Sequence, residues 1–133
     1  MFLERLLNQG SAPVLERMAH FTAQRHKLLA ENVANADTPG YRMKDVSLTE
    51  FQQQLIDRVE ERKTAKPGTV GFDDITADVR NPRANILFHD RNNRSMDQLM
   101  SDAARNGLMH NMYTELIRRQ YGSIDSALKE RVT

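Results

Sequence analysis

Residues 95–131 read SMDQLMSDAARNGLMHNMYTELIRRQYGSIDSALKER, and this stretch decides the fold. Ser95 and Gln98 have the spacing of a capping box, which marks the start of a helix. Apolar side chains then recur at three- and four-residue steps, the period of one helix face. They are Met96, Leu99, Met100, Ala103, Met109, Tyr113, Leu116, Ile117, Tyr121, Ile124 and Leu128. The pattern predicts one continuous helix, roughly 50–55 Å long at the standard rise per residue.

A helix of this length cannot enclose a small core by itself, so its apolar stripe must lie along another helix. The partner is expected near the N-terminus, where Ser11 offers an N-cap and Pro13 fits a first turn. Apolar positions follow at helical spacing from Val14 to Ala36. This helix spans about six turns and is about ten residues shorter than its partner. Part of the C-terminal stripe is therefore expected to lack cover inside the chain.

The N-terminal helix has a clear stop signal. The residue before Pro39 is biased out of the α region. Pro39 and Gly40 fit the two central positions of a type II turn, in which Gly supplies a positive φ. The helix must therefore end near Asn35 or Ala36, and residues 1–41 form an N-terminal helical region that closes on this turn.

Residues 42–94 form a central segment with a less regular pattern. Ser47 and Glu50 have the spacing of a second capping box, and a narrow apolar seam then predicts a short helix over residues 48–63. The seam consists of Leu48, Phe51, Leu55 and Val59. A loop rich in helix breakers, KPGTVG, comes next. Residues 75–88 are expected to hold two brief extended segments.

The expected fold is mainly α and elongated. The N- and C-terminal helices pair as an antiparallel, coiled-coil-like hairpin. The central segment adds a short helix and an irregular or partly β stretch. Three regions follow, namely residues 1–41, residues 42–94 and the long C-terminal helix at residues 95–133.

The composition limits both the core and the function. Hydrophobic residues make up 39% of the 133 residues, with five Phe, three Tyr and no Trp, which is little for a self-sufficient core. The net charge of +1 argues against a dedicated nucleic-acid binder. Without cysteine, disulfides and thiolate metal sites are excluded. Glu4 and Arg5 interrupt the first apolar stretch, so we expect no cleaved signal peptide.

Side chains that could carry chemistry are scattered along the sequence. No two histidines have the i,i+4 spacing of a helical zinc site. They are His20, His26, His89 and His110. No phosphate-binding loop or nucleophile elbow occurs in the sequence. The acidic pairs Asp73-Asp74 and Glu60-Glu61 are typical of a solvated surface. We therefore expect no enzyme activity, no cofactor and no metal site.

One stretch resembles a known family. Residues 29–42, LAENVANADTPGYR, are similar to the N-terminal signature of flagellar rod and hook proteins. The direct Asp-Thr-Pro-Gly-Tyr continuation resembles the FlgB-type, proximal rod proteins. Asn92-Asn93 and the string ARNGLMHN, with Asn106 and Asn111, are similar to the family's C-terminal pattern. Glu31, Arg94-Ser95 and His110 depart from that pattern.

The resemblance implies a structural subunit of the bacterial flagellar basal body. Such proteins pair their terminal helices within a shaft that transmits motor torque. The implied partners are other rod and basal-body proteins, copies of the same chain and the flagellar export apparatus. No nucleic acid, cofactor or small-molecule substrate is implied. Export through the flagellar type III apparatus, without a cleaved leader, would bring the chain to the rod.

The residues expected to carry this function fall into two sets. The first is the assembly and turn motif: Asn32, Asn35, Asp37, Thr38, Pro39, Gly40 and Tyr41. The second packs the C-terminal helix: Leu99, Ala103, Asn106, Asn111, Tyr113, Ile117, Ile124 and Leu128. Asn32 and Asn35 share a helix face, so they either bond across to the turn or another helix, or satisfy nearby backbone groups.

Two other functions compete with the structural subunit. A helical chaperone or adaptor of a type III secretion system would also be amphipathic and would lack a signal peptide, but it would be a compact soluble dimer. A small enzyme is disfavoured because no convergent set of polar residues is apparent.

Overall fold

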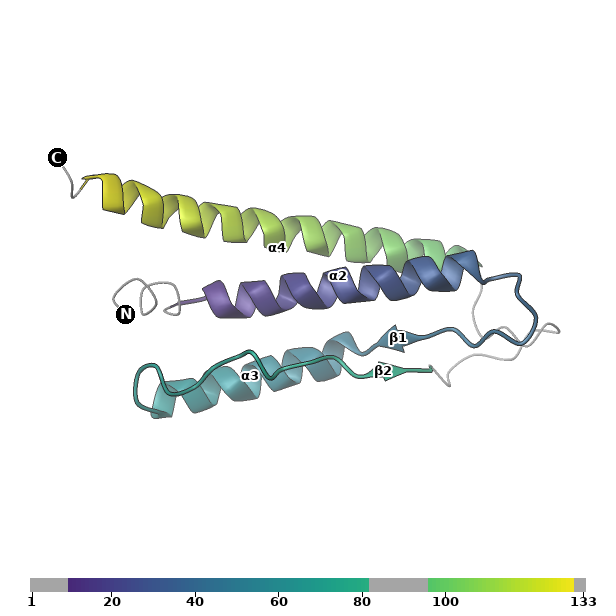
Figure 1. The fold of residues 1–133 in the computed structure, drawn as a ribbon, viewed down its shortest axis with the longest axis horizontal. Helices are drawn as coiled ribbons and strands as arrows, with labels where there is room; N and C mark the ends of the chain where they lie inside the picture. The colour runs from purple at the N-terminus through teal and green to yellow at the C-terminus, as the bar shows by residue number, and fades with distance from the viewer. Residues whose placement is uncertain (1–9, 82–95, 131–133) are drawn as a thin grey trace.

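The computed structural model describes residues 10–81 and 96–130. This part of the chain holds three helices and two short strands: α2 (Ala12–Ala34), β1 (Asp45–Val46), α3 (Leu48–Thr64), β2 (Val79–Arg80) and α4 (Met96–Glu130). Figure 1 shows α2 between α4 on one side and α3 on the other. The prediction of a mainly helical fold is confirmed. Some expected features lie outside the described residues: Ser95, Asn92-Asn93, Arg94, His89 and residues 82–88.

The helix α2 starts where its sequence predicts, but not through the expected cap. Pro13 occupies its first turn. Ser11 already has near-helical dihedrals, φ −91° and ψ −7°, so its hydroxyl makes no capping bond. That hydroxyl instead donates to Oε1 of Gln120 on α4, at 3.1 Å. The expected side-chain cap at Ser11 is therefore wrong.

The terminal helices α2 and α4 pack together, as predicted. They run antiparallel, because partners early in α2 lie late in α4: Ser11 bonds Gln120, whereas Thr22 bonds Asn106 (Figure 1). The helix α4 has 35 residues and α2 has 23, so α4 extends beyond its partner. The difference in length agrees with the prediction that part of the α4 stripe has no cover from α2.

The chain leaves α2 through the predicted turn. The amide of Tyr41 donates to the carbonyl of Thr38 at 3.1 Å, which closes a four-residue turn around Pro39 and Gly40. Gly40 has φ +76°, the left-handed value that a type II turn requires at this position. The turn sends the chain back along α2 on the side opposite α4.

The helix α3 begins at a genuine cap. The hydroxyl of Ser47 accepts a bond from the amide of Glu50 at 3.3 Å. The Glu50 carboxylate does not complete the capping box, because it pairs with Arg80 of β2 at 2.7 Å. Where two extended segments were expected in residues 75–88, the described part has one strand, β2. It pairs antiparallel with β1, in the register Asp45 to Arg80 and Val46 to Val79.

The core consists of two clusters along α2. The first joins α2 to α3 and the segment after it: Met18, Phe21, Val46, Phe51, Leu55, Phe72 and Ile75. The second joins the end of α2 to α4 and the returning chain: Leu29, Ala36, Met43 and Leu99. The fold is thus held by two small cores, as the low aromatic content suggests.

Candidate assembly interface

Asn32 fixes the path of the chain after the turn. Its side chain is buried, and its Nδ2 donates to the carbonyl of Lys44 at 2.6 Å. Its Oδ1 accepts the amide of Lys44 at 2.9 Å and the hydroxyl of Tyr41 at 3.3 Å. The side-chain amide of Asn32 thus bonds both the carbonyl and the N–H of Lys44. This geometry matches the expectation of a bond from Asn32 to the turn region.

Asn35 makes local contacts. Its Nδ2 donates to the carbonyl of Glu31, one turn earlier, at 2.8 Å. Its Oδ1 accepts the hydroxyl of Thr38 at 3.4 Å. The alternative of local backbone satisfaction therefore describes Asn35, while Asn32 reaches across the chain.

The remaining turn residues are placed toward solvent, except Tyr41. Residues 37–40 (Asp37, Thr38, Pro39 and Gly40) are all exposed. Tyr41 is half-buried against the second core cluster. Burial, with a smaller contribution from the charge of Glu31, raises the pKa of the Tyr41 hydroxyl above its ordinary value. Tyr41 therefore anchors the turn by packing and by its bond to Asn32.

A polar group is buried in the contact between α2 and α4. Thr22 and Asn106 are both fully buried, and Nδ2 of Asn106 donates to the carbonyl of Thr22 at 2.8 Å. The Thr22 hydroxyl lies 2.8 Å from Nδ1 of His110 and is also within bonding distance of the carbonyls of Met18 and Ala19. Because the Thr22 hydroxyl donates its single proton to a backbone carbonyl, its oxygen accepts a bond from the N–H of the His110 tautomer that carries the proton on Nδ1.

This buried polar group sets the register of the helix pair. The Oδ1 of Asn106 has no hydrogen-bond partner among residues 10–81 and 96–130. A shift of one helix along the other would also leave Nδ2 unpaired, and each orphaned buried group costs about 1–3 kcal/mol. A single buried Asn fixes the register of coiled coils for the same reason.

The other expected packing residues of α4 differ in burial. Leu99 is fully buried in the second cluster, with Ala103 packed beside it. Tyr113, Ile117 and Ile124 are half-buried. Asn111 and Leu128 are exposed, so the chain's own core does not include them. The expected packing set therefore divides into residues that are buried or half-buried and residues that α2 leaves exposed.

Sequence analysis missed a second apolar stripe on α4. Leu108, Met112 and Leu116, the outer stripe, follow at four-residue steps and are 71%, 50% and 39% exposed. Leu108 is nine residues from the buried Leu99, about two and a half turns, so it lies on the opposite side of α4. Leu108 and Met112 could have been found by testing the helix for a second face.

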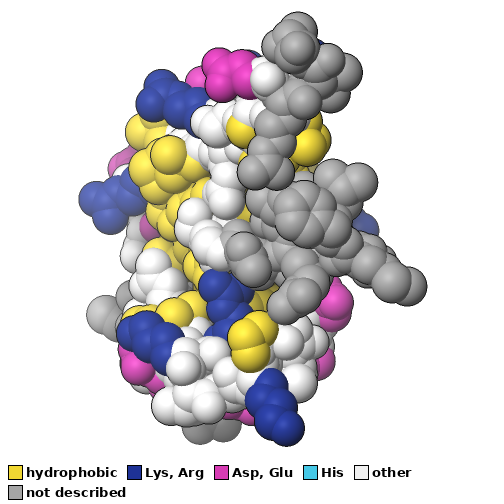
Figure 2. Space-filling view, turned by 90° about the vertical axis from the view of Figure 1, so that its left-hand side faces the viewer, with side chains coloured by type: hydrophobic (Ala, Val, Ile, Leu, Met, Phe, Trp, Pro, Cys, Tyr) yellow, Lys and Arg dark blue, Asp and Glu magenta, His cyan; other side chains and the backbone are white. Residues whose placement is uncertain are grey.

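Other apolar side chains are exposed along the molecule. An end-on view shows hydrophobic side chains reaching the surface between lysine and arginine side chains (Figure 2). Met96 and Met100 are exposed near the start of α4, as Leu128 is near its end. Together with the outer stripe, they leave α4 with much uncovered apolar surface. Within this surface, Leu108, Met112 and Leu116 are neighbours at four-residue steps, and contiguous exposed apolar patches mark contact sites.

An ion pair also holds β1 against α2. The guanidinium of Arg25 donates to both carboxylate oxygens of Asp45, at 2.9 and 3.0 Å, and Oδ1 of Asp45 accepts the amide of Val46. Hydrogen bonding to Asp45 raises the pKa of Arg25 despite an opposing desolvation effect. No local sequence pattern predicts this pair, because its members lie on different elements.

The described residues offer no group of three or more His, Cys, Asp or Glu side chains placed to hold a metal ion. Within the same ranges, no helix combines the length and apolar character needed to cross a membrane.

Similar proteins agree on one family. No family model matches the chain. The flagellar basal body rod protein FlgB of Aquifex aeolicus is 26% identical over 116 residues, covering 87% of this chain and 90% of the relative. The proteins of the same name from Salmonella typhimurium and Bacillus subtilis are 28% and 26% identical. They cover 80% and 92% of this chain and 84% and 95% of their own lengths.

The similarity spans most of the chain and most of each relative, so it concerns more than the turn motif. Six relatives carry the same name. This agreement does not favour the chaperone or adaptor. Over most of its length the chain is similar to FlgB-type flagellar basal-body rod proteins, and its function is that of a structural rod subunit.

Proposed function

We propose that this chain builds the proximal part of the rod, by packing its terminal helices against copies of itself and other rod proteins. The assembled shaft transmits motor torque. The observation that carries this proposal is the outer stripe of α4. Leu108, Met112 and Leu116 point away from α2, on a helix whose other face is already packed. A second helix is therefore needed to cover them.

The size of the outer stripe suits a contact between subunits. Fully burying one Leu or Met side chain contributes about 1.5–3 kcal/mol. Three such side chains, repeated at every subunit of an assembly, provide a substantial part of a contact. Arg105, Glu115 and Arg119 are exposed on the same helix and can provide polar contacts at its edge.

The proposal assigns different roles to the two sets of expected residues. The turn motif, through Asn32 and Tyr41, holds the returning chain in place. Leu99, Asn106 and the half-buried residues of α4 keep the two terminal helices in register, as a coiled-coil-like hairpin. Asn111 and Leu128, both exposed, add to the surface between subunits. The chain carries no chemistry of its own and binds no cofactor, substrate or nucleic acid.

The proposed route to the rod is the flagellar type III export apparatus, without cleavage of a leader. Export and assembly can therefore be measured separately for each variant, as subunit in the medium and subunit in purified basal bodies.

The proposal is tested by a charge on the outer stripe. We expect Leu108→Asp and Met112→Asp to be exported normally but to be absent from basal bodies, because burying an unpaired carboxylate costs several kcal/mol. Both positions are exposed in the monomer, so circular dichroism and the midpoint of thermal unfolding should remain close to those of the parent. Normal rods from both variants would contradict the proposed contact.

Two comparison variants make the result specific. Ser126→Asp adds the same charge at an exposed position beyond the outer stripe and should assemble normally. Ile117→Asp adds it at a half-buried position that faces α2, and should lower the stability of the monomer itself. Loss of assembly without loss of monomer stability is thus expected only for the outer stripe.

A further inference from the structure

The helix α3 and the segment after it form an arm, residues 48–78, that lies along α2 on the side away from α4 (Figure 1). The arm covers an apolar face of α2. Met18 and Phe21 of α2 are buried in one cluster with Phe51 of α3 and Phe72 of the following segment. The rings of Phe21 and Phe51 stack with their centres 4.5 Å apart. Without the arm, this face of α2 would be apolar and open to solvent.

The base of the arm is held by buried contacts. Asn32 bonds the backbone of Lys44 just before β1, and the side chains of Arg25 and Asp45 are only 14% and 10% exposed in their ion pair. The strand β1 then pairs with β2 at the end of the arm. Buried pairs of this kind are little affected by salt.

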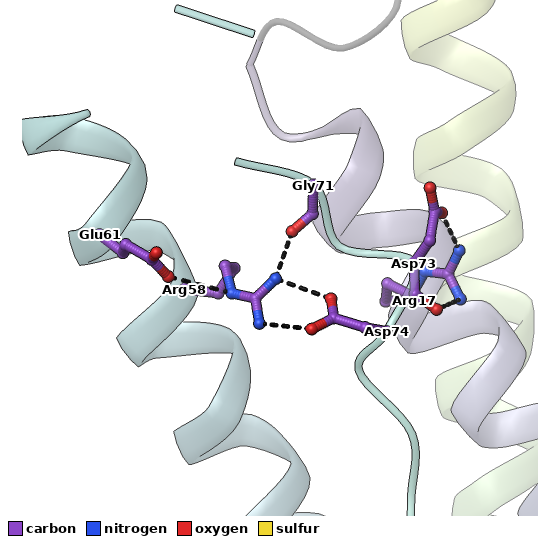
Figure 3. Close-up of polar contacts among 6 residues, drawn as sticks. All are labelled: Arg17, Arg58, Glu61, Gly71, Asp73 and Asp74. Carbon is purple, nitrogen blue, oxygen red and sulfur yellow. Dashed lines mark hydrogen bonds and ion pairs between the residues drawn. The ribbon is translucent and has the colours of Figure 1, made fainter. Parts of the chain in front are cut away.

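The tip of the arm is held differently, by exposed ion pairs. Asp73 and Asp74 are adjacent but pair with different helices: Asp73 with Arg17 on α2, and Asp74 with Arg58 on α3 (Figure 3). Their side chains are 94% and 69% exposed. The sequence suggested a solvated acidic pair. Both are exposed, but each holds an arginine. Exposed ion pairs are weak and are screened by salt.

Arg62 adds a further contact at the tip. Its Nη2 donates to the carbonyl of Gly10 at 2.8 Å, just before α2. Its guanidinium lies 5.4 Å from the centre of the Phe72 ring. The polar contacts at the tip are thus arginine contacts to exposed partners, whereas the polar contacts at the base include the buried pair of Arg25 with Asp45.

We infer that the arm is hinged at β1 and β2 and opens from its tip, exposing the face of α2 around Met18 and Phe21. The pair of α2 and α4 stays intact during this opening. Backbones approach closely along that pair, whereas α3 has little close backbone contact with α2 and reaches it through side chains.

The test uses single introduced cysteines, because the chain has none of its own. Met18→Cys reports on the face beneath the tip, and Met43→Cys reports on the buried region beside the base. In molar sodium chloride, we expect a maleimide to label Met18→Cys at least tenfold faster than Met43→Cys. Low salt should reduce that ratio.

The contact at the tip of the arm is tested by Asp73→Asn, which removes the ion pair with Arg17 of α2. This change should speed labelling of Met18→Cys about two- to fivefold, the range expected for one exposed pair, and leave Met43→Cys unchanged. Glu60→Gln is the matched control, since it removes an exposed carboxylate whose partner, Lys63, lies on α3 itself. It should change neither rate.

Equal labelling at both cysteines, without a response to salt or to Asp73→Asn, would overturn the hinged arm. If Met18→Cys fails to fold, amide exchange of the unsubstituted protein decides. Faster, salt-dependent exchange at residues 58–64 than at residues 43–46 supports the hinge, and equal exchange refutes it. None of these measurements needs a flagellum, so they stand or fall separately from the assembly of the outer-stripe variants.

Discussion

Near the end of α2, Asn32 and Asn35 make different contacts. Asn32 uses both ends of its buried amide to hold the backbone of Lys44, whereas Asn35 bonds the carbonyl of Glu31 within its own helix. The difference arises from where the returning chain passes. The returning chain runs beside Asn32, and the Asn32 side chain bonds both the N–H and the carbonyl of Lys44, as a neighbouring strand would. Only the three-dimensional path distinguishes the two positions.

An aspartate at each position tests this difference. We expect Asn32→Asp to lower the free energy of unfolding by about 1–3 kcal/mol, because a carboxylate cannot donate to the Lys44 carbonyl and leaves it unpaired. Asn35→Asp loses only a bond in a half-buried site at the helix end and should cost less than about 1 kcal/mol. Urea unfolding of both variants gives the comparison. Equal losses would contradict the assigned role of Asn32.

At the scale of elements, α4 has two apolar faces. Leu99 and Asn106 pack against α2, while the outer stripe faces away. Gly107 lies between these faces, and an added Cβ there would meet no atom within 4 Å. The monomer therefore gives this glycine no packing reason. Gly40 differs, because its φ of +76° requires glycine although the space around it is equally open.

Alanine at these two glycines should act in opposite directions. Gly107→Ala should stabilise the monomer by about 0.5–1 kcal/mol, since alanine is the better helix former and meets no obstacle. Gly40→Ala should destabilise it by about 1–2 kcal/mol, the cost of a left-handed conformation for a residue with a Cβ. Denaturant midpoints at equal slope measure both. A destabilised Gly107→Ala monomer would contradict the open space found around Gly107.

At the scale of the whole molecule, we expect a segment to be well ordered only where other segments pack over it. Both cores lie along α2, and α4 is buried only where it runs beside α2. Among residues 10–81 and 96–130, the hydrogen bonds between the C-terminal half of α4 and the start of α2 are those of Gln120 with Ser11 and of Tyr121 with Glu16. Residues 125–130 are all exposed. The molecule is thus a helix pair with an arm on one side and an uncovered helix end on the other.

Amide exchange along α4 in the dilute monomer should show this gradient. We expect the strongest protection around residues 99–110 and weak protection beyond Tyr121, because a helix end without tertiary packing opens readily. Assembly into rods should remove the gradient by covering the exposed part. Uniformly strong protection to residue 130 in the monomer would contradict the expected role of neighbouring subunits.

The sequence alone predicted the three helices and the turn that follows α2, but not the strand β1. Helical periodicity predicted α2, α3 and α4, and Pro39 with Gly40 predicted the turn, because these signals act within a few residues of the chain. It also predicted that α4 would outrun its partner. The resemblance in residues 29–42 pointed to the rod family that the similar proteins support.

The tertiary structure decided which side chains meet. The division of labour between Asn32 and Asn35, the pairing of Arg25 with Asp45 and the separate partners of Asp73 and Asp74 all depend on segments distant in sequence. Local sequence patterns do not predict such pairs, because asparagine, aspartate and arginine are all common on a solvated surface as well. The sequence can show a second apolar face on α4, but only the burial of Leu99 and Asn106 decided which of the two faces lies against α2.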